Sequence, residues 1–172
     1  MPVSAADVLI DGFSRIRQGV HAALDGMDAA GLATPPEPGA NTVAWLVWHL
    51  CRVQDDHVAD AAGTEQVWLR DGWSERAGLP FAAEATGYAQ SADEVAAVHL
   101  DPDLLAGYAD AVHEATVAYV GGLTADDLDR IVDDAWDPPV TLAVRLLSVV
   151  SDDLQHVGQA AYIRGLLQRQ HG

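Results

Sequence analysis

The chain has 172 residues and a formal net charge of -17, from 26 acidic and 9 basic residues. A field of this sign repels phosphate backbones, and no basic stripe offsets it, which argues against nucleic-acid binding. No run of about eighteen apolar residues is free of charge, and no basic segment precedes an apolar one at the N-terminus, so we expect neither a membrane span nor a secretion signal. The one cysteine, Cys51, allows no internal disulfide. These features favour a cytoplasmic protein.

Four segments have apolar residues at spacings of three and four, the period of an amphipathic helix. They cover about residues 4–24, 41–62, 101–120 and 141–167. Asn41 is the expected N-cap of the second segment, and Pro102 stands at the favoured first position of the third. A long stretch, residues 64–100, separates the second and third segments and contains a short helical pattern at 91–98. Residues 126–139 are expected to form a loop.

No segment shows the two-residue alternation of a strand, and no linker divides the chain. The sequence therefore predicts an all-α protein with a single domain, residues 1–172. The expected architecture is a four-helix bundle with a long, partly helical insertion between its second and third helices.

Three side chains that bind metals lie on the apolar faces of two of these helices. His49 shares a stripe with Leu46, Leu50 and Val53 of the second helix. Asp152 and His156 lie one turn apart on the apolar stripe of the fourth. An acid and an imidazole at that spacing can chelate one ion, and a histidine from a facing helix would complete three ligands. Three protein ligands leave a position open for water or substrate, as in catalytic sites.

A structural interpretation of the same residues is open. His49 could be a hydrogen-bonded core histidine, and Asp152 could pair with Arg145, two turns earlier on the same face. His57 leans toward the apolar stripe but lies eight residues after His49, a rise of about 12 Å, so it cannot share a metal ion with His49. It could line the mouth of a pocket or be a half-buried polar residue. Cys51 points away from His49 and is expected to be a small buried hydrophobe.

Two segments of the chain resemble those of a known family. The segments Asn41-x-x-Ala-Trp-Leu-x-Trp-His-Leu50 and Asp152-Asp-Leu-x-His-x-Gly-Gln159 are similar to those of the DinB-like superfamily. More narrowly, they resemble its actinobacterial branch related to mycothiol-dependent enzymes. The resemblance implies a four-helix bundle that holds a divalent metal through one histidine and a later His-x-x-x-His pair. His49 and His156 match two of these positions, and Asp152 stands where the pattern has histidine.

The resemblance also implies a function. Members of the superfamily include thiol S-transferases and a maleylpyruvate isomerase that use a low-molecular-weight thiol. We therefore expect a metal-dependent enzyme that transfers such a thiol to a small electrophile. Zinc is the first expectation, with nickel, iron or manganese as alternatives. Arg52 and Arg145 are candidates to hold a carboxylate of the small-molecule substrate, with His57 as a further binding residue.

Two other functions compete with thiol transfer. One is a metal-assisted hydrolase of a small molecule, and the other is a non-catalytic, stress-linked bundle protein. We also expect a homodimer, because the five tryptophans exceed what a small core can hold. Trp68 and Trp73 lie in the insertion, where no helical face is expected to cover them, and exposed aromatic residues are typical of ligand pockets and interfaces. The alternative is that the insertion folds back and buries them in one subunit.

Overall fold

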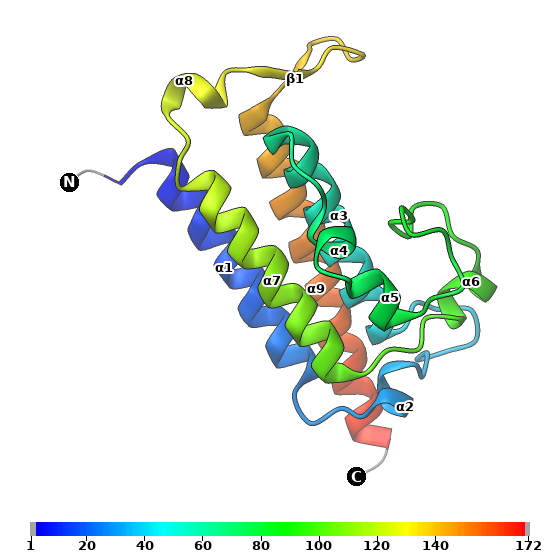
Figure 1. Cartoon of the computed structure of the whole chain (residues 1–172). Coiled ribbons are helices and arrows are strands. Elements are labelled where there is room, and N and C mark those ends of the chain that lie inside the picture. Colours follow the sequence, from blue (N-terminus) through cyan, green and yellow to red (C-terminus); the bar gives the residue numbers. More distant parts are fainter. Residues whose placement is uncertain (1–2, 171–172) are drawn as a thin grey trace.

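The computed structural model describes residues 3–170, and four long helices form its body (Figure 1). They are α1 (Ala5–Leu24), α3 (Val43–Ala62), α7 (Pro102–Val120) and α9 (Leu142–Gln170). The predicted all-α bundle is confirmed, and the four predicted helices differ from these only by a few residues at their ends. In the described part of the chain, no helix has both the length and the apolar character needed to cross a membrane.

The helix ends follow from local hydrogen bonding. Thr42, not Asn41, is the N-cap of α3, and its Oγ1 accepts a hydrogen bond from the Trp45 backbone N–H at 3.1 Å. The predicted N-cap was thus wrong by one residue, because the Thr42 hydroxyl accepts from a backbone N–H of the first turn, as an asparagine side chain would. Gly63 ends α3 in the left-handed conformation. Pro102 opens α7, as expected.

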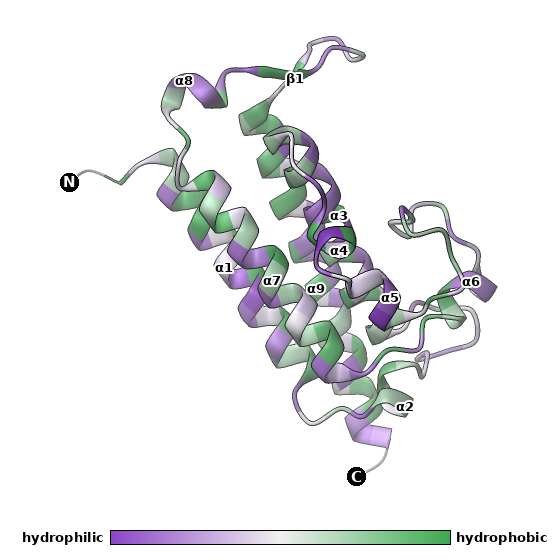
Figure 2. Cartoon of the chain, in the orientation of Figure 1, coloured by the Kyte–Doolittle hydropathy of each residue, from purple (hydrophilic) through white to green (hydrophobic). Residues whose placement is uncertain are grey.

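The long helices form a closed ring in which α1 contacts α7 and α9, and α3 contacts the same two helices. Each long helix carries both apolar and hydrophilic residues, as expected of amphipathic helices (Figure 2). In Figure 1 the chain runs in one direction through α3 and α7 and in the opposite direction through α1 and α9. Because α3 and α9 are antiparallel neighbours, the start of α3 faces the middle of α9, and the second half of α3 faces the first half of α9.

The insertion between α3 and α7 folds back onto the bundle. It contains the short helices α4 (Val67–Arg70), α5 (Trp73–Ala77) and α6 (Ala92–Ala96), while α2 (Ala29–Leu32) lies between α1 and α3. Trp68 is only 2% exposed, and its ring centroid lies 4.8 Å from that of Tyr108. Trp73 also packs against Tyr108, at 5.8 Å. The expectation that no helix covers these two tryptophans was therefore wrong, since α7 supplies that surface.

A small element precedes the last helix where the sequence predicts a loop. After α8 (Ala125–Leu128), the strands β1 (Ile131–Asp133) and β2 (Val140–Thr141) form an antiparallel pair. Strands of this length are too short to show alternation in the sequence. Their effect is to place Asp133 beside the first turns of α9, where it meets Arg145.

Candidate metal centre and its pocket

The three predicted metal ligands come together between α3 and α9. One ligating atom each from His49, Asp152 and His156 lies within 4.8 Å of the others. Coordination bonds of about 2.0–2.2 Å place tetrahedral ligands about 3.4 Å apart, so small side-chain rotations bring these atoms to bonding distance. The prediction that the two helices bring these side chains together is confirmed. Two imidazoles and a carboxylate suit zinc and the other first-row divalent ions.

The backbone of the insertion holds the ring of His49. Its Nδ1 lies 2.6 Å from the carbonyl oxygen of Thr86, which can only accept, so Nδ1 carries the proton and Nε2 keeps its lone pair. Burial lowers the pKa of His49 below 6.5, while the Thr86 bond and Asp152 act in the opposite direction. The neutral imidazole with a free Nε2 is the form that binds a metal. The indole of Trp45 stacks on this ring at 4.6 Å.

The ring of His156 is held in the same way by its own helix. Its Nδ1 lies 2.9 Å from the side-chain Oε1 of Gln159, one turn further along α9. Its Nε2 faces Asp152, at 3.6 Å from Oδ2. Both histidines therefore present Nε2 toward Asp152, and a carbonyl oxygen holds the other nitrogen of each. The role of Gln159 was missed from the sequence, although its spacing from His156 would have allowed it to be found.

Arg145 does not pair with Asp152. Its Nη2 donates to Asp133 at 2.9 Å, and its Nη1 lies 3.0 Å from Nδ1 of His57. The alternative interpretation, in which Arg145 neutralises Asp152, is therefore wrong. Among the described residues, the one ion-pair contact of Asp152 within 4.0 Å is with His156. A carboxylate between two imidazoles without a permanent cation is a donor set that a divalent ion fits.

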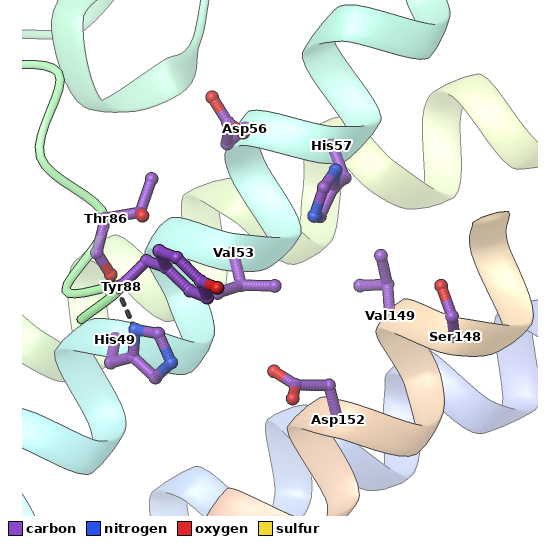
Figure 3. A pocket seen from close by; sticks show the side chains of 9 residues that line it. All are labelled: His49, Val53, Asp56, His57, Thr86, Tyr88, Ser148, Val149 and Asp152. Atoms are coloured by element: carbon purple, nitrogen blue, oxygen red, sulfur yellow. Dashed lines mark hydrogen bonds between the residues drawn. The ribbon is translucent and has the colours of Figure 1, made fainter. Parts of the chain in front are cut away.

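A cavity of about 480 Å³ opens directly beside these ligands (Figure 3). Its walls come from α3, α9 and the loop at residues 86–88. They are His49, Val53, Asp56, His57, Thr86, Tyr88, Ser148, Val149 and Asp152. In Figure 3, His57 projects from α3 and Asp152 from α9 into the same open space. His57 is half-buried and lines the cavity, so its position is compatible with both alternatives left open by the sequence.

Arg52 does not reach this cavity. Its side chain is fully buried, and its three guanidinium nitrogens donate to other groups of the protein. These acceptors are the backbone oxygens of Ala85 and Glu84 and the side chains of Gln66, Tyr108 and Asp55. With its donors already used, Arg52 has none for a substrate carboxylate, in contrast to the sequence-based expectation.

The role of Arg52 is to position the loop that holds His49. Trp45, His49 and Arg52 follow one face of α3, and each binds the segment 85–90 through Gln90, Thr86 and Ala85 respectively. Gly87 lets that loop approach closely, since a Cβ there would lie 2.7 Å from Nδ1 of His49. No sequence pattern indicates this anchoring, because it joins residues more than thirty positions apart.

Asp153, next to the candidate ligand Asp152, is a second feature that sequence reasoning missed. It is fully buried, and neither carboxylate oxygen has a hydrogen-bond partner among the described residues. Burial raises the pKa of Asp153 well above its ordinary value, and Asp152 acts in the same direction. Burial thus favours the protonated, neutral form of this carboxyl group. Cys51 is also buried, as predicted, and burial raises the pKa of its thiol.

The bundle and the His/Asp/His group define a DinB-like protein with a candidate metal centre. The chain belongs to the mycothiol-S-transferase family, whose family model matches residues 8–169. A solved structure described as a conserved protein from Enterococcus faecalis superposes with a TM-score of 0.90 at 29% identity, covering 96% of this chain and 98% of that one. No curated protein matches the chain.

Proposed function

We propose that the protein is a divalent-metal-dependent enzyme that transfers a low-molecular-weight thiol, mycothiol or a close relative, to a small electrophile. The observation behind this proposal is the convergence of His49, Asp152 and His156 in a chain of the mycothiol-S-transferase family. His49 and Asp152 also line the cavity. Zinc is the expected metal, with nickel, iron or manganese as alternatives. Such an enzyme would work in the cytoplasm, where small thiols are kept reduced.

The chemistry of the donor set supports a thiol substrate. A divalent ion, when bound, would lower the pKa of a thiol in the cavity and so favour the nucleophilic form at neutral pH. Two neutral imidazoles and one carboxylate do not fully neutralise such an ion, which leaves it a net positive charge for an anionic sulfur. Thr86 and Gln159 keep each histidine in the tautomer that binds through Nε2.

The cavity gives the electrophile a place to bind. Its volume of about 480 Å³ is within the range of small-molecule sites. Val53 and Val149 supply apolar wall, while Ser148 and His57 supply polar groups. The side chains of α3 and α9 thus hold the two reactants next to each other, which lowers the entropic cost of their reaction.

Metal analysis and a thiol-dependence assay test this proposal together. Protein purified without a chelator or a metal-affinity tag is expected to contain close to one divalent ion, and to consume a model electrophile only when mycothiol is present. Turnover with metal but without thiol would identify the hydrolase instead. Less than about a tenth of an equivalent of metal, with no turnover, would favour the non-catalytic bundle protein.

The matched variants are His49→Ala and His156→Ala, compared with His99→Ala, whose residue lies outside the cavity. The two site variants should lose most of the metal and stay helical, because each removes one of three protein ligands. Full metal retention in both would exclude the proposed triad.

A further inference from the structure

The cavity is lined by a further polar group, His57. His57 lies two turns after His49 on α3, a distance of about 12 Å along the helix axis. Because α9 runs antiparallel to α3, this level of the bundle meets Arg145 of α9 rather than Asp152 and His156. His57 is partly exposed and lines the cavity.

Arg145 determines which nitrogen of His57 carries the proton. A guanidinium has donors and no acceptor, so the contact of 3.0 Å between Arg145 Nη1 and His57 Nδ1 requires a lone pair on Nδ1. The proton of the neutral ring therefore lies on Nε2. Burial lowers the pKa of His57, and the charge of Arg145 lowers it further, while Asp56, Asp60 and Asp152 act in the opposite direction. The ring is thus uncharged and can donate through Nε2.

That donor has no partner in the described part of the chain. The one hydrogen bond of the His57 ring there is the contact of Nδ1 with Arg145. Nε2 is not buried without a partner, and His57 lines the cavity, so this donor is accessible from the cavity. Figure 3 shows the ring projecting from α3 into the space that Val149 and Asp152 face from α9.

The charges around the cavity select the kind of acceptor that this donor would bind. Its described lining residues include the acids Asp56 and Asp152 and no arginine or lysine. The charge of Arg145 is already paired with Asp133 at 2.9 Å. A carboxylate bound to His57 would lie near Asp56, and the nearest protein cation, Arg145, is already paired with Asp133 and cannot offset the repulsion. An uncharged oxygen, such as a ketone, ester or imide carbonyl, has no such cost.

We propose that His57 binds a neutral carbonyl oxygen of the electrophilic substrate through Nε2–H, and that Arg145 is a positioning residue that fixes this tautomer. The role of that carbonyl in a substrate rests on the proposed thiol transfer, whereas its binding at His57 does not. A hydrogen bond to the carbonyl oxygen withdraws electron density from the carbon that a thiol attacks. The site would thus take uncharged electrophiles in preference to carboxylates, in contrast to the arginine-bound carboxylate expected from the sequence.

The test uses two unreactive probes of similar size, N-ethylsuccinimide, which is uncharged, and succinate, which is a dianion. Their binding to the protein as purified is followed by NMR with ¹⁵N-labelled histidine, without added thiol. Affinity is read from the shift of the His57 Nε2 resonance, so succinate bound to a metal ion near His49 is not counted. By this measure the imide is expected to bind at least tenfold more tightly than succinate. His57→Leu should weaken imide binding about five- to tenfold, which corresponds to the loss of one hydrogen bond. His57→Gln, which keeps an N–H donor at a similar reach, should stay within about twofold of the native protein.

The tautomer of His57 can be measured directly, and a purely structural role of Arg145 would leave it unchanged. In the native protein the ¹⁵N spectrum should show the His57 proton on Nε2, and Arg145→Leu should introduce the Nδ1–H form. A proton on Nδ1 in the native protein, unchanged imide binding in His57→Leu, no imide binding at all, or a preference for succinate would each overturn the proposal. Probe binding as described, combined with no thiol transfer to any electrophile, would refute the proposed function and leave the carbonyl site standing.

Discussion

Replacing Gly87 with alanine perturbs the candidate centre without touching a ligand. Gly87 has φ +94, and an added Cβ would lie 2.7 Å from His49 Nδ1 and 3.1 Å from Cζ3 of Trp48. Real Cβ atoms do not come so close, so the loop must move away from α3. That movement breaks the bond between Thr86 and His49, which holds the imidazole in its metal-binding tautomer.

The expected loss of folding stability in Gly87→Ala has two parts. An alanine at positive φ costs about 1–2 kcal/mol of folding stability, and loss of the buried His49 bond adds about 0.5–1.5 kcal/mol. Gly39 is a matched control, since its φ is +81 and a Cβ there meets nothing within 4 Å. Gly39→Ala should show only the first part. The difference between the two variants therefore isolates the contact with His49, because the effect on the unfolded chain is shared.

Urea unfolding measures the stability difference, and competition with a chromogenic chelator measures zinc affinity. Gly87→Ala should bind zinc about 10- to 100-fold more weakly than the native protein, as expected when a residue that orients a ligand is disturbed. Gly39→Ala should bind zinc normally. Equal zinc affinity in the two variants would refute the claim that the insertion positions His49.

Four further outcomes are expected. Gln159→Leu should weaken zinc binding about tenfold, while Gln155→Leu on the same helix leaves it unchanged; equal effects in a chelator competition would contradict the role of Gln159. Arg52→Met should lower the free energy of unfolding by about 3–5 kcal/mol, because Asp55 loses its buried cation, and a loss under 1 kcal/mol in urea would contradict this. Because burial lowers the pKa of His57, its contribution to stability is present above pH 6.5 and is lost as the pH falls below 6.5 toward the folded-state pKa. His57→Gln should flatten this part of the stability profile, and an unchanged slope would show that His57 does not titrate as described. The packing of Trp68 and Trp73 on α7 removes the original reason for a homodimer, but Leu147 and Tyr162 of α9 are 62% and 67% exposed. Light scattering at low micromolar concentration should therefore give about twice the mass of 18.2 kDa, whereas a concentration-independent mass near 18.2 kDa would exclude the homodimer.

The sequence predicted the parts of this protein that depend on helical periodicity. The spacing of apolar residues is enough to place His49 on one buried face and Asp152 with His156 on another. It does not show that these faces meet, because that depends on the ring order of the helices. The resemblance to the DinB-like superfamily supplied this step, and the antiparallel packing of α3 on α9 explains it.

The contacts that position the candidate ligands could not be predicted from the sequence, for a physical reason. Arg52 appeared free to bind a substrate because its partners, among them the carbonyls of residues 84 and 85, lie in a loop without periodicity. The pairing of Arg145 with Asp133 likewise depends on a short hairpin that leaves no alternation pattern. Backbone carbonyls are present at every residue, so residue identity does not reveal which of them accept hydrogen bonds.

The most direct test of the central claim is an anomalous-scattering map from crystals of the zinc-loaded protein, recorded above and below the zinc absorption edge. The account predicts one strong peak between His49 Nε2, a carboxylate oxygen of Asp152 and His156 Nε2, at about 2.0–2.2 Å from each. No peak at this position, or a peak held by other residues, would contradict the assignment of a metal centre between α3 and α9.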